Sequence, residues 1–259
     1  VCGILEKKFK SVKNNFYLNK PFINIFEKPN KFSKVSSQIL YGEKFKIVSK
    51  KKNYLKIKTM YDKYIGYIKK DKYPRNLVSN YKVKVLKANI FKEPKITKKT
   101  KECLPFSSEI NVSDTKSIFF RFDKNKWIKK SEVVKINFKI NNYLKIFNLF
   151  KDCKYLWGGK TFRGIDCSAL IQIYFKFNNK FYPRDTIDQI KFRRGRKNNY
   201  KFNTGDLIYW KGHVAVCKNS NYLIHAYGPL KKVTIMPIEK TIKIIKKTAG
   251  LKVKKVFSI

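Results

Sequence analysis

An internal repeat in the N-terminal half constrains the fold more than any other feature of the chain. Residues 24–29 read NIFEKP and residues 89–94 read NIFKEP, an offset of 65 residues. Further on, GYIKK at residues 66–70 returns as KWIKK at residues 126–130, an offset of 60. Two similar segments in the same order at similar offsets are unlikely to arise by chance. They indicate two homologous modules of about sixty residues each.

Each copy contains short β-rich runs separated by polar turns, a pattern that predicts a small β-barrel. In the first copy these runs occupy residues 45–48, 54–57 and 65–68. Together with the NIFEKP turn, the blocks LYGE (40–43), YLKI (54–57) and GYI (66–68) resemble the bacterial SH3 (SH3b) domain. The second copy is divergent, because LPF at residues 104–106 replaces the Gly-Glu turn, while Trp127 is retained in the closing strand.

The chain changes character at residue 141. Apolar residues recur at helical spacing over residues 141–152, and a second apolar helix is predicted over residues 167–177, with Asp166 suited to its N-cap. Antiparallel strands are expected after it, at residues 205–210, 214–217, 222–226 and 233–238. This last third is therefore predicted to have its helices first and its sheet second.

The expected fold class is α+β. Two small β-barrel modules precede a domain in which helices pack on an antiparallel sheet. The predicted domains are residues 1–75, residues 76–138 (the divergent module) and residues 139–259, with a linker around residues 73–80 that contains Pro74.

Composition excludes several classes of protein. A hydrophobic content of 43% is too high for a disordered tail protein, despite the net charge of +44. Only seven of the 61 basic residues are Arg, which nucleic-acid readers favour, so no specific nucleic-acid partner is expected. The longest stretch without a charged residue, 219–230, contains Gly228 and Pro229 and is too short to span a bilayer. Composition leaves the oligomeric state open.

The cysteines do not form a recognisable framework. They number five, with no CxxC pair, which argues against a disulfide scaffold or a zinc ribbon. The N-terminal residues lack an apolar run long enough for a secretory signal, so a reduced, cytoplasmic protein is expected. Four of the cysteines are interpreted as small core residues: Cys2, Cys103, Cys153 and Cys217.

Cys167 differs from the other cysteines because it begins a predicted helix, where the helix dipole stabilises a thiolate. The chain has only two histidines, His213 and His225, and both lie in one predicted hairpin that turns near residues 219–221. With a loop of odd length between the strands, positions 213 and 225 point to one face of adjacent strands, within reach of each other. An activated thiol needs a base and a group that orients the base, and these three residues supply that set.

Around these residues the sequence resembles the NlpC/P60 family of papain-like cysteine peptidases. The resemblance covers about residues 141–240 and departs at Ala169, where the family usually has Gly. It rests on the following blocks: YLWGG (155–159), GIDCSAL (164–170), PRDT (183–186), GDL (205–207), HVA (213–215) and IHA (224–226).

This resemblance implies a role for each site residue. Cys167 would be the nucleophile, His213 the general base and His225 the residue that orients it, while the Tyr155 hydroxyl would stand beside the oxyanion. The substrate's free L-alanine amine would be held by Asp166 and Ser168. Thr186 would line the same pocket, and Glu43 and Tyr64 of the first module would close over the amine. The alternative for Asp166 is that it only caps the helix.

The expected activity is hydrolysis of the bond between γ-D-glutamate and a diamino acid in murein peptides with a free N-terminal L-Ala, without a cofactor, in murein recycling. Whether the diamino acid is diaminopimelate or lysine stays open. One alternative is a zinc site built from Cys167, His213 and His225, although their spacing matches no common zinc pattern. The other is a secreted or non-catalytic protein whose SH3b modules bind cell wall or nucleic acid.

Overall fold

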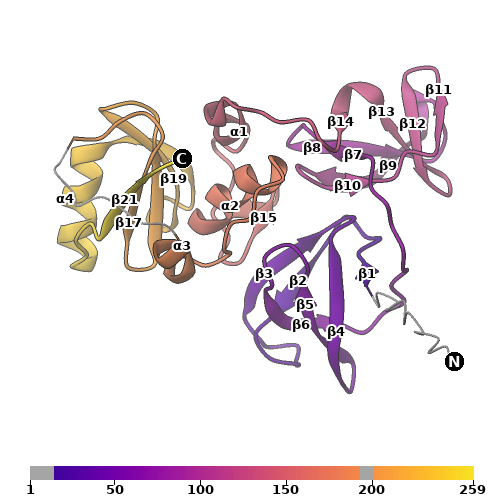
Figure 1. Cartoon of the computed structure of the whole chain (residues 1–259), viewed down its shortest axis with the longest axis horizontal. Helices are drawn as coiled ribbons and strands as arrows, with labels where there is room; N and C mark the ends of the chain where they lie inside the picture. Colours follow the sequence, from indigo (N-terminus) through magenta and orange to yellow (C-terminus); the bar gives the residue numbers. More distant parts are fainter. Residues whose placement is uncertain (1–14, 193–200) are drawn as a thin grey trace, which may run out of the picture.

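The computed structural model describes residues 15–192 and 201–259 (Figure 1). Two β modules lie next to each other, and an α+β domain follows them in the chain, which confirms the predicted fold class. The expected core position of Cys2 lies outside the described residues. No helix within the described ranges is both long enough and apolar enough to cross a bilayer.

The first module is one antiparallel sheet in the order β1-β4-β5-β6-β2-β3. Its strands curl around an apolar core that includes Ile25, Phe45 and Ile57, so a single sheet encloses its own interior. The predicted β-rich runs all fall in strands. The bounds are β1 (Phe16–Tyr17), β2 (Phe22–Phe26), β3 (Val35–Leu40), β4 (Lys44–Lys51), β5 (Tyr54–Thr59) and β6 (Ile65–Lys69).

The second module divides its strands between two sheets, β10-β7-β14 and β11-β12-β13-β8-β9. Ala88, Ile90, Leu104 and Ile128 form its core. Two 3-10 turns, Ile96–Lys98 and Lys130–Glu132, connect strands. The strand bounds are β7 (Tyr81–Val83), β8 (Lys87–Phe91), β9 (Lys99–Pro105), β10 (Glu109–Ile110), β11 (Asp114–Lys116), β12 (Phe119–Asp123), β13 (Lys126–Lys129) and β14 (Val133–Lys135).

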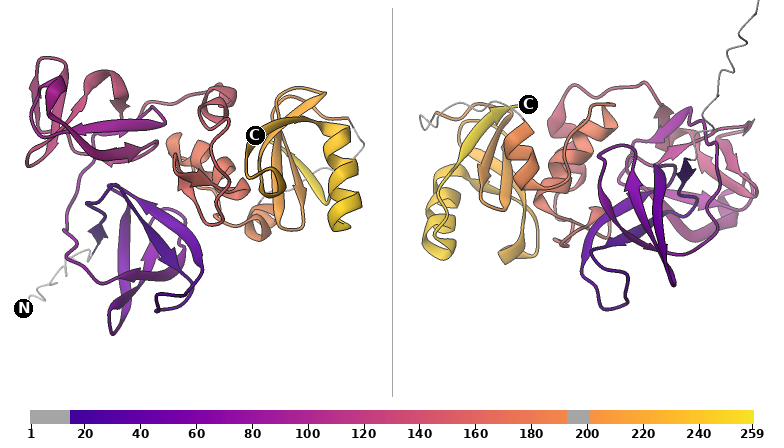
Figure 2. Two further views of the ribbon diagram at one scale, coloured as in Figure 1. Left: turned by 180° about the vertical axis from the view of Figure 1, so that it is seen from behind. Right: turned by 60° about the horizontal axis from the view of Figure 1, so that its bottom comes forward.

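The α+β domain is built on an antiparallel sheet of order β20-β19-β18-β17-β21, seen from two sides in Figure 2. It also contains a short hairpin and a 3-10 turn (Gly228–Leu230). The remaining bounds are α1 (Tyr143–Leu149), β15 (Lys160–Thr161), β16 (Gly164–Ile165), α2 (Cys167–Phe177), α3 (Thr186–Phe192), β17 (Asp206–Trp210), β18 (His213–Cys217), β19 (Tyr222–Tyr227), β20 (Lys232–Pro237), α4 (Ile238–Ala249) and β21 (Lys255–Ser258).

Helices cover both faces of this sheet. Val214, Val216 and Ile224 belong to the core that contains α2, whereas Ala215 and Leu223 belong to the core that contains α4. This alternation follows from the period of two in a strand. The prediction that all helices precede the sheet is wrong, because α4 comes after its fourth strand along the chain.

Of the two helices predicted from the sequence, only α1 differs from its predicted bounds. Helix α1 is shorter than residues 141–152, because Asn142 caps it by accepting a hydrogen bond from the Leu144 N–H at 3.1 Å. Helix α2 has the predicted bounds, and the Asp166 carboxylate accepts from the Ala169 N–H at 2.8 Å. The Asp166 cap fixes the helix start, so Cys167 is its first residue.

Candidate active site

The Cys167 thiol lies where the start of α2 meets the start of β18. The residue is 6% exposed, and its Sγ atom is 3.9 Å from the carbonyl oxygen of Gly212. Backbone N–H groups of Val214 and Ser168 also point at the sulfur. Gly212 and Val214 flank His213, so the strand segment that carries this histidine borders the thiol.

Burial decides the protonation state of this thiol. Desolvation, and after it the neighbouring Asp166 carboxylate, raise the pKa of Cys167 to about 12, although the two backbone N–H groups and Arg184 act in the opposite direction. The helix start therefore does not outweigh burial, and the thiol stays protonated in the unliganded protein. The sulfur needs a base that removes its proton as it attacks.

The two histidines form the contact that their spacing predicts. His213 Nε2 lies 2.9 Å from His225 Nδ1, and His225 is fully buried. In the described part of the sheet, β18 and β19 pair at Val216 with Ile224 and at Cys217 with Leu223, so the strands separate toward the histidines. Burial lowers the pKa of His213 to about 4, which leaves its imidazole neutral near pH 7 and able to accept a proton.

The contact between His225 and Met236 on the next strand assigns the tautomers. His225 Nε2 lies 3.3 Å from the Met236 sulfur, and a thioether accepts hydrogen bonds but cannot donate them. His225 therefore carries its proton on Nε2, and its Nδ1 accepts from the Nε2–H of His213. This hydrogen-bond network leaves Nδ1 of His213 as the basic nitrogen.

Tyr155 lies close enough to Cys167 and Asp166 for both to act on its hydroxyl. Its backbone is held between two neighbours, because its N–H donates to the Lys231 carbonyl at 2.8 Å and it forms a bridge with Ile165. Burial raises the pKa of its hydroxyl, and nearby Cys167 and Asp166 raise it further. A protonated hydroxyl close to Cys167 can donate to an oxyanion that forms there.

Asp166 is held in a buried ion pair with Arg184. Arg184 donates to both Asp166 oxygens, at 3.0 and 2.6 Å, and Asp166 also accepts from the Gly158 N–H at 2.9 Å and the Ser168 hydroxyl at 3.1 Å. These partners already use the oxygens that were expected to hold a substrate amine. Asp166 thus caps α2 and pairs with Arg184, and it lines the pocket beside Cys167 as well.

A pocket of about 260 Å³ opens beside Cys167. Of the predicted binding residues, Asp166, Ser168, Thr186 and Tyr64 line it. Several other residues that line it had no role predicted from the sequence, although two of them belong to the blocks PRDT and YLWGG. These additional lining residues are Glu27, Ser36, Trp157, Asp185, Ile187 and Gly212.

The two added carboxyl groups matter for the chemistry of the pocket. Burial, together with nearby Asp166, raises the pKa of Asp185, while Arg184 opposes the rise. Glu27 corresponds to Lys92 in the second copy, where Lys and Glu stand in the opposite order. No other signal in the sequence marks this residue.

Glu43 does not take part in this pocket. Its Oε2 atom accepts from the Leu40 N–H at 2.8 Å, and its Oε1 atom lies 3.5 Å from Nζ of Lys176 on α2. The residue is 6% exposed. The prediction that Glu43 closes over a substrate amine is therefore wrong, because its carboxylate is buried against Lys176.

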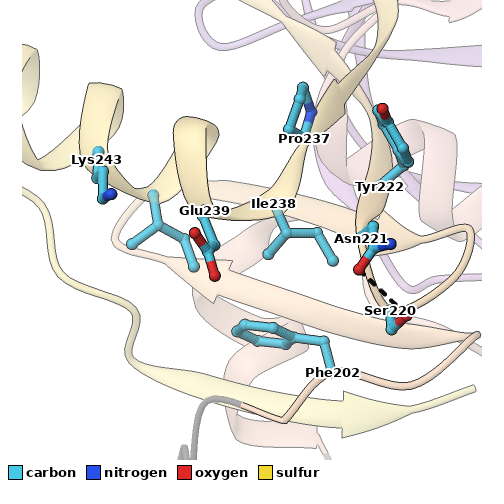
Figure 3. A pocket seen from close by; sticks show the side chains of 9 residues that line it. Phe202, Ser220, Asn221, Tyr222, Pro237, Ile238, Glu239 and Lys243 are labelled. Atoms are coloured by element: carbon cyan, nitrogen blue, oxygen red, sulfur yellow. Dashed lines mark hydrogen bonds between the residues drawn. The ribbon is translucent and has the colours of Figure 1, made fainter.

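A larger cavity of about 610 Å³ lies at the start of α4 and the turn before β19 (Figure 3). Phe202, Ile238 and Ile242 give it apolar walls, and Glu239 and Lys243 stand at the helix. Among the described residues it shares no lining residue with the pocket at Cys167, and we do not assign it to the chemistry. Within the same residues, no three His, Cys, Asp or Glu side chains gather in a way that could hold a metal ion.

Comparison with known families identifies two segments. Residues 152–249 match the NlpC/P60 family, and residues 25–72 match the family described as bacterial dipeptidyl-peptidase Sh3 domain. Both resemblances seen in the sequence are thereby confirmed.

Relatives and solved structures extend these matches. Gamma-D-glutamyl-L-lysine dipeptidyl-peptidase of Bacillus subtilis (strain 168) is 32% identical over 36% of this chain, a match that spans only 34% of that protein. Dipeptidyl-peptidase 6 of Lysinibacillus sphaericus is 25% identical over 78% of this chain and 84% of its own length. The crystal structure of an NlpC/P60 family protein from Bacillus cereus ATCC 10987 has a TM-score of 0.75 at 16% identity, and the match covers 92% of this chain and 98% of that one. This likeness extends the shared fold over nearly the whole chain.

Proposed function

We propose that this chain, which carries an NlpC/P60 domain behind a bacterial SH3 domain, is a cysteine peptidase that cuts the bond between γ-D-glutamate and a diamino acid in murein peptides with a free N-terminal L-Ala. The observation that carries the proposal is the small acidic pocket beside the Cys167 thiol, with Glu27 and Asp185 in its lining. Carboxyl groups there suit a substrate ammonium.

In this mechanism the Cys167 sulfur attacks the γ-carbonyl carbon of D-glutamate while His213 removes the thiol proton. The Cys167 N–H and the Tyr155 hydroxyl stabilise the oxyanion. Protonated His213 then gives its proton to the leaving amine of the diamino acid, and a thioester remains on Cys167. Water, activated by His213, hydrolyses the thioester and restores the free enzyme.

Substrate specificity in this proposal depends on the pocket residues that contact the N-terminal L-alanine. We assign the L-alanine ammonium to Asp185 and the Tyr64 hydroxyl, because Arg184 already pairs with both oxygens of Asp166. A substrate that still carries sugar on its L-alanine has an amide there and no ammonium. The substrates in this proposal are therefore released wall fragments, and the enzyme works in their recycling in the cytoplasm.

The experiment compares kcat/KM for a free tripeptide, L-Ala-γ-D-Glu-L-Lys or its diaminopimelate counterpart, with that for the N-acetylated form. An unpaired carboxylate in the pocket should cost the acetylated form about a hundredfold, of the order of 3 kcal/mol. Asp185→Asn should reduce this preference, whereas Asp188→Asn, in the first turn of α3, should keep it. Equal rates on the two wild-type substrates would refute amine recognition and favour a hydrolase of intact wall.

A further inference from the structure

The turn at residues 40–43 is the place where the three parts of the chain meet. Leu40 is buried in the core of the α+β domain. Tyr41 is buried in the core of the second module, edge-on to Phe122 with 5.5 Å between the ring centroids. Successive residues of one turn therefore anchor the first module to two different neighbours.

Gly42 lets the second module approach this turn closely. A Cβ atom at Gly42 would lie 2.0 Å from the carbonyl oxygen of Glu109, and the Gly42 φ angle is +80°. The Glu109 N–H donates to the Tyr41 carbonyl at 3.0 Å. Both the space and the backbone conformation require glycine here.

Ion pairs also connect the same three parts of the chain. Lys176 of α2, whose side chain is 2% exposed, has its Nζ atom 3.5 Å from Glu43 of the first module and 2.9 Å from Glu109 of the second. Burial alone would lower the pKa of Lys176, but these two carboxylates raise it above its usual value. A buried ammonium group that pairs with one carboxylate from each module fixes the positions of the two modules relative to α2.

The nucleophile helix has one polar stripe, and it faces the modules. All residues of α2 are buried, and Ser168, Gln172 and Lys176 follow each other at intervals of four, on one face of the helix. Gln172 donates to Asp62 of the first module at 3.0 Å. At the end of the helix, Lys82 of the second module donates to the Phe177 carbonyl.

Strand β3 connects this junction with the substrate pocket. Ser36 lines the pocket, Ser37 accepts from Arg184 Nε at 3.0 Å, and Gln38 accepts from the Lys160 N–H at 2.8 Å. The strand ends at Leu40, where the junction begins. A displacement of the turn would therefore move the pocket wall relative to Cys167.

We propose that the second module positions the substrate pocket by holding the turn at residues 40–43, and that Gly42, Glu109 and Lys176 are positioning residues. The effect on catalysis rests on the proposed function. None of these three residues lines the pocket. The second module thus acts through the first one, and its contacts should affect substrate binding more than the chemical step.

Two variants with matched controls test this role in the full chain. Glu109→Gln keeps a polar side chain that is 31% exposed, and its control is Glu93→Gln, whose carboxylate pairs with Lys98 on the surface of the same module. Gly42→Ala adds a Cβ atom against Glu109, and its control is Gly250→Ala, which has a φ of +67° and open space around it. Glu109→Asp is the conservative rescue.

The readouts are KM and kcat for the cleaved tripeptide and hydrogen exchange at the Lys160 amide, which reports docking of β3 without any substrate. Glu109→Gln should raise KM about tenfold with little change in kcat, and should speed exchange at Lys160 roughly tenfold. Glu109→Asp should restore part of the wild-type KM and part of the wild-type exchange rate. Gly42→Ala should raise both quantities more than Glu109→Gln does. If Gly42→Ala does not fold, the KM and the exchange rate of Glu109→Gln decide by themselves whether the second module positions the pocket.

The outcomes separate the two proposals. An unchanged KM in Glu109→Gln, or exchange no faster than in Glu93→Gln, would overturn the positioning role. A wild-type protein that cleaves no tripeptide would refute the proposed function. The exchange measurement would then still decide whether the second module holds β3 against the α+β domain.

Discussion

The Nε2 atom of His213 lies 2.9 Å from the Nδ1 atom of His225. Because the Met236 sulfur accepts a hydrogen bond from the Nε2–H of His225, the contact between the two rings makes His213 the donor and leaves its Nδ1 free to accept. The histidine pair thus makes Nδ1 of His213 the atom that can accept a proton. The site needs this because the Cys167 thiol is protonated before substrate arrives.

Replacement of His225 tests its orienting role. His225→Asn should keep part of the activity, because an amide oxygen can still accept from the Nε2–H of His213. His225→Leu should lose much more, since His213 is then free to take the wrong tautomer. Steady-state kinetics with a free tripeptide measure both. Equal losses in the two variants would contradict an orienting hydrogen bond.

Met236→Leu tests the tautomer assignment. It removes the acceptor for the His225 Nε2–H and keeps a similar apolar volume. We expect kcat to fall several-fold, on the order of 1 kcal/mol, with KM nearly unchanged. Met60→Leu is the matched control, because the chain has two methionines and this one lies in the first module. Equal kinetics in the two variants would refute the role of the sulfur.

The pH dependence of kcat/KM follows from the buried base. Burial lowers the pKa of His213 to about 4, so protonation removes the base only as the pH falls through that value. Activity should therefore stay level from neutral pH down to about pH 5 and decline below it. A pH profile on the free tripeptide checks this. An acidic limb centred near the ordinary histidine pKa of about 6.5 would contradict a buried, neutral His213.

Arg184→Met tests the buried ion pair. It would leave the Asp166 carboxylate buried without its cation, so stability should fall by about 3–5 kcal/mol. Arg121→Met is the control, because its partner Asp114 lies on an exposed surface at 3.3 Å and exposed pairs contribute little. Thermal unfolding followed by calorimetry compares the two. Equal stability of the two variants would contradict the assigned role of Arg184.

Local patterns predicted the parts of the site that depend on regular structure. The cap at Asp166 placed Cys167 at a helix start, and the even spacing of twelve residues between His213 and His225 put the two rings on one face and in contact. Helix α4 was also predictable, because Ile238, Ile242 and Ile245 recur at helical spacing, but it was missed.

The contacts between distant segments could not be predicted in this way. Asp166 and Arg184 are separated by a helix, and Glu43 and Lys176 lie in different domains. A motif shows that a carboxylate is present, but its partner depends on how the domains pack. For that reason the two acidic residues that were assigned to the substrate, Asp166 and Glu43, proved to be paired with cations of the protein, and Asp185 was overlooked as a pocket residue beside Asp166.

The most direct test of the central claim is the product analysis of L-Ala-γ-D-Glu-L-Lys and its diaminopimelate counterpart by mass spectrometry. The substrates are incubated with the wild-type protein, Cys167→Ala and the matched control Cys103→Ala. The proposal predicts L-Ala-D-Glu and the free diamino acid from the wild type and from Cys103→Ala, and no product from Cys167→Ala. Substantial turnover by Cys167→Ala, or cleavage at a different bond, would contradict it.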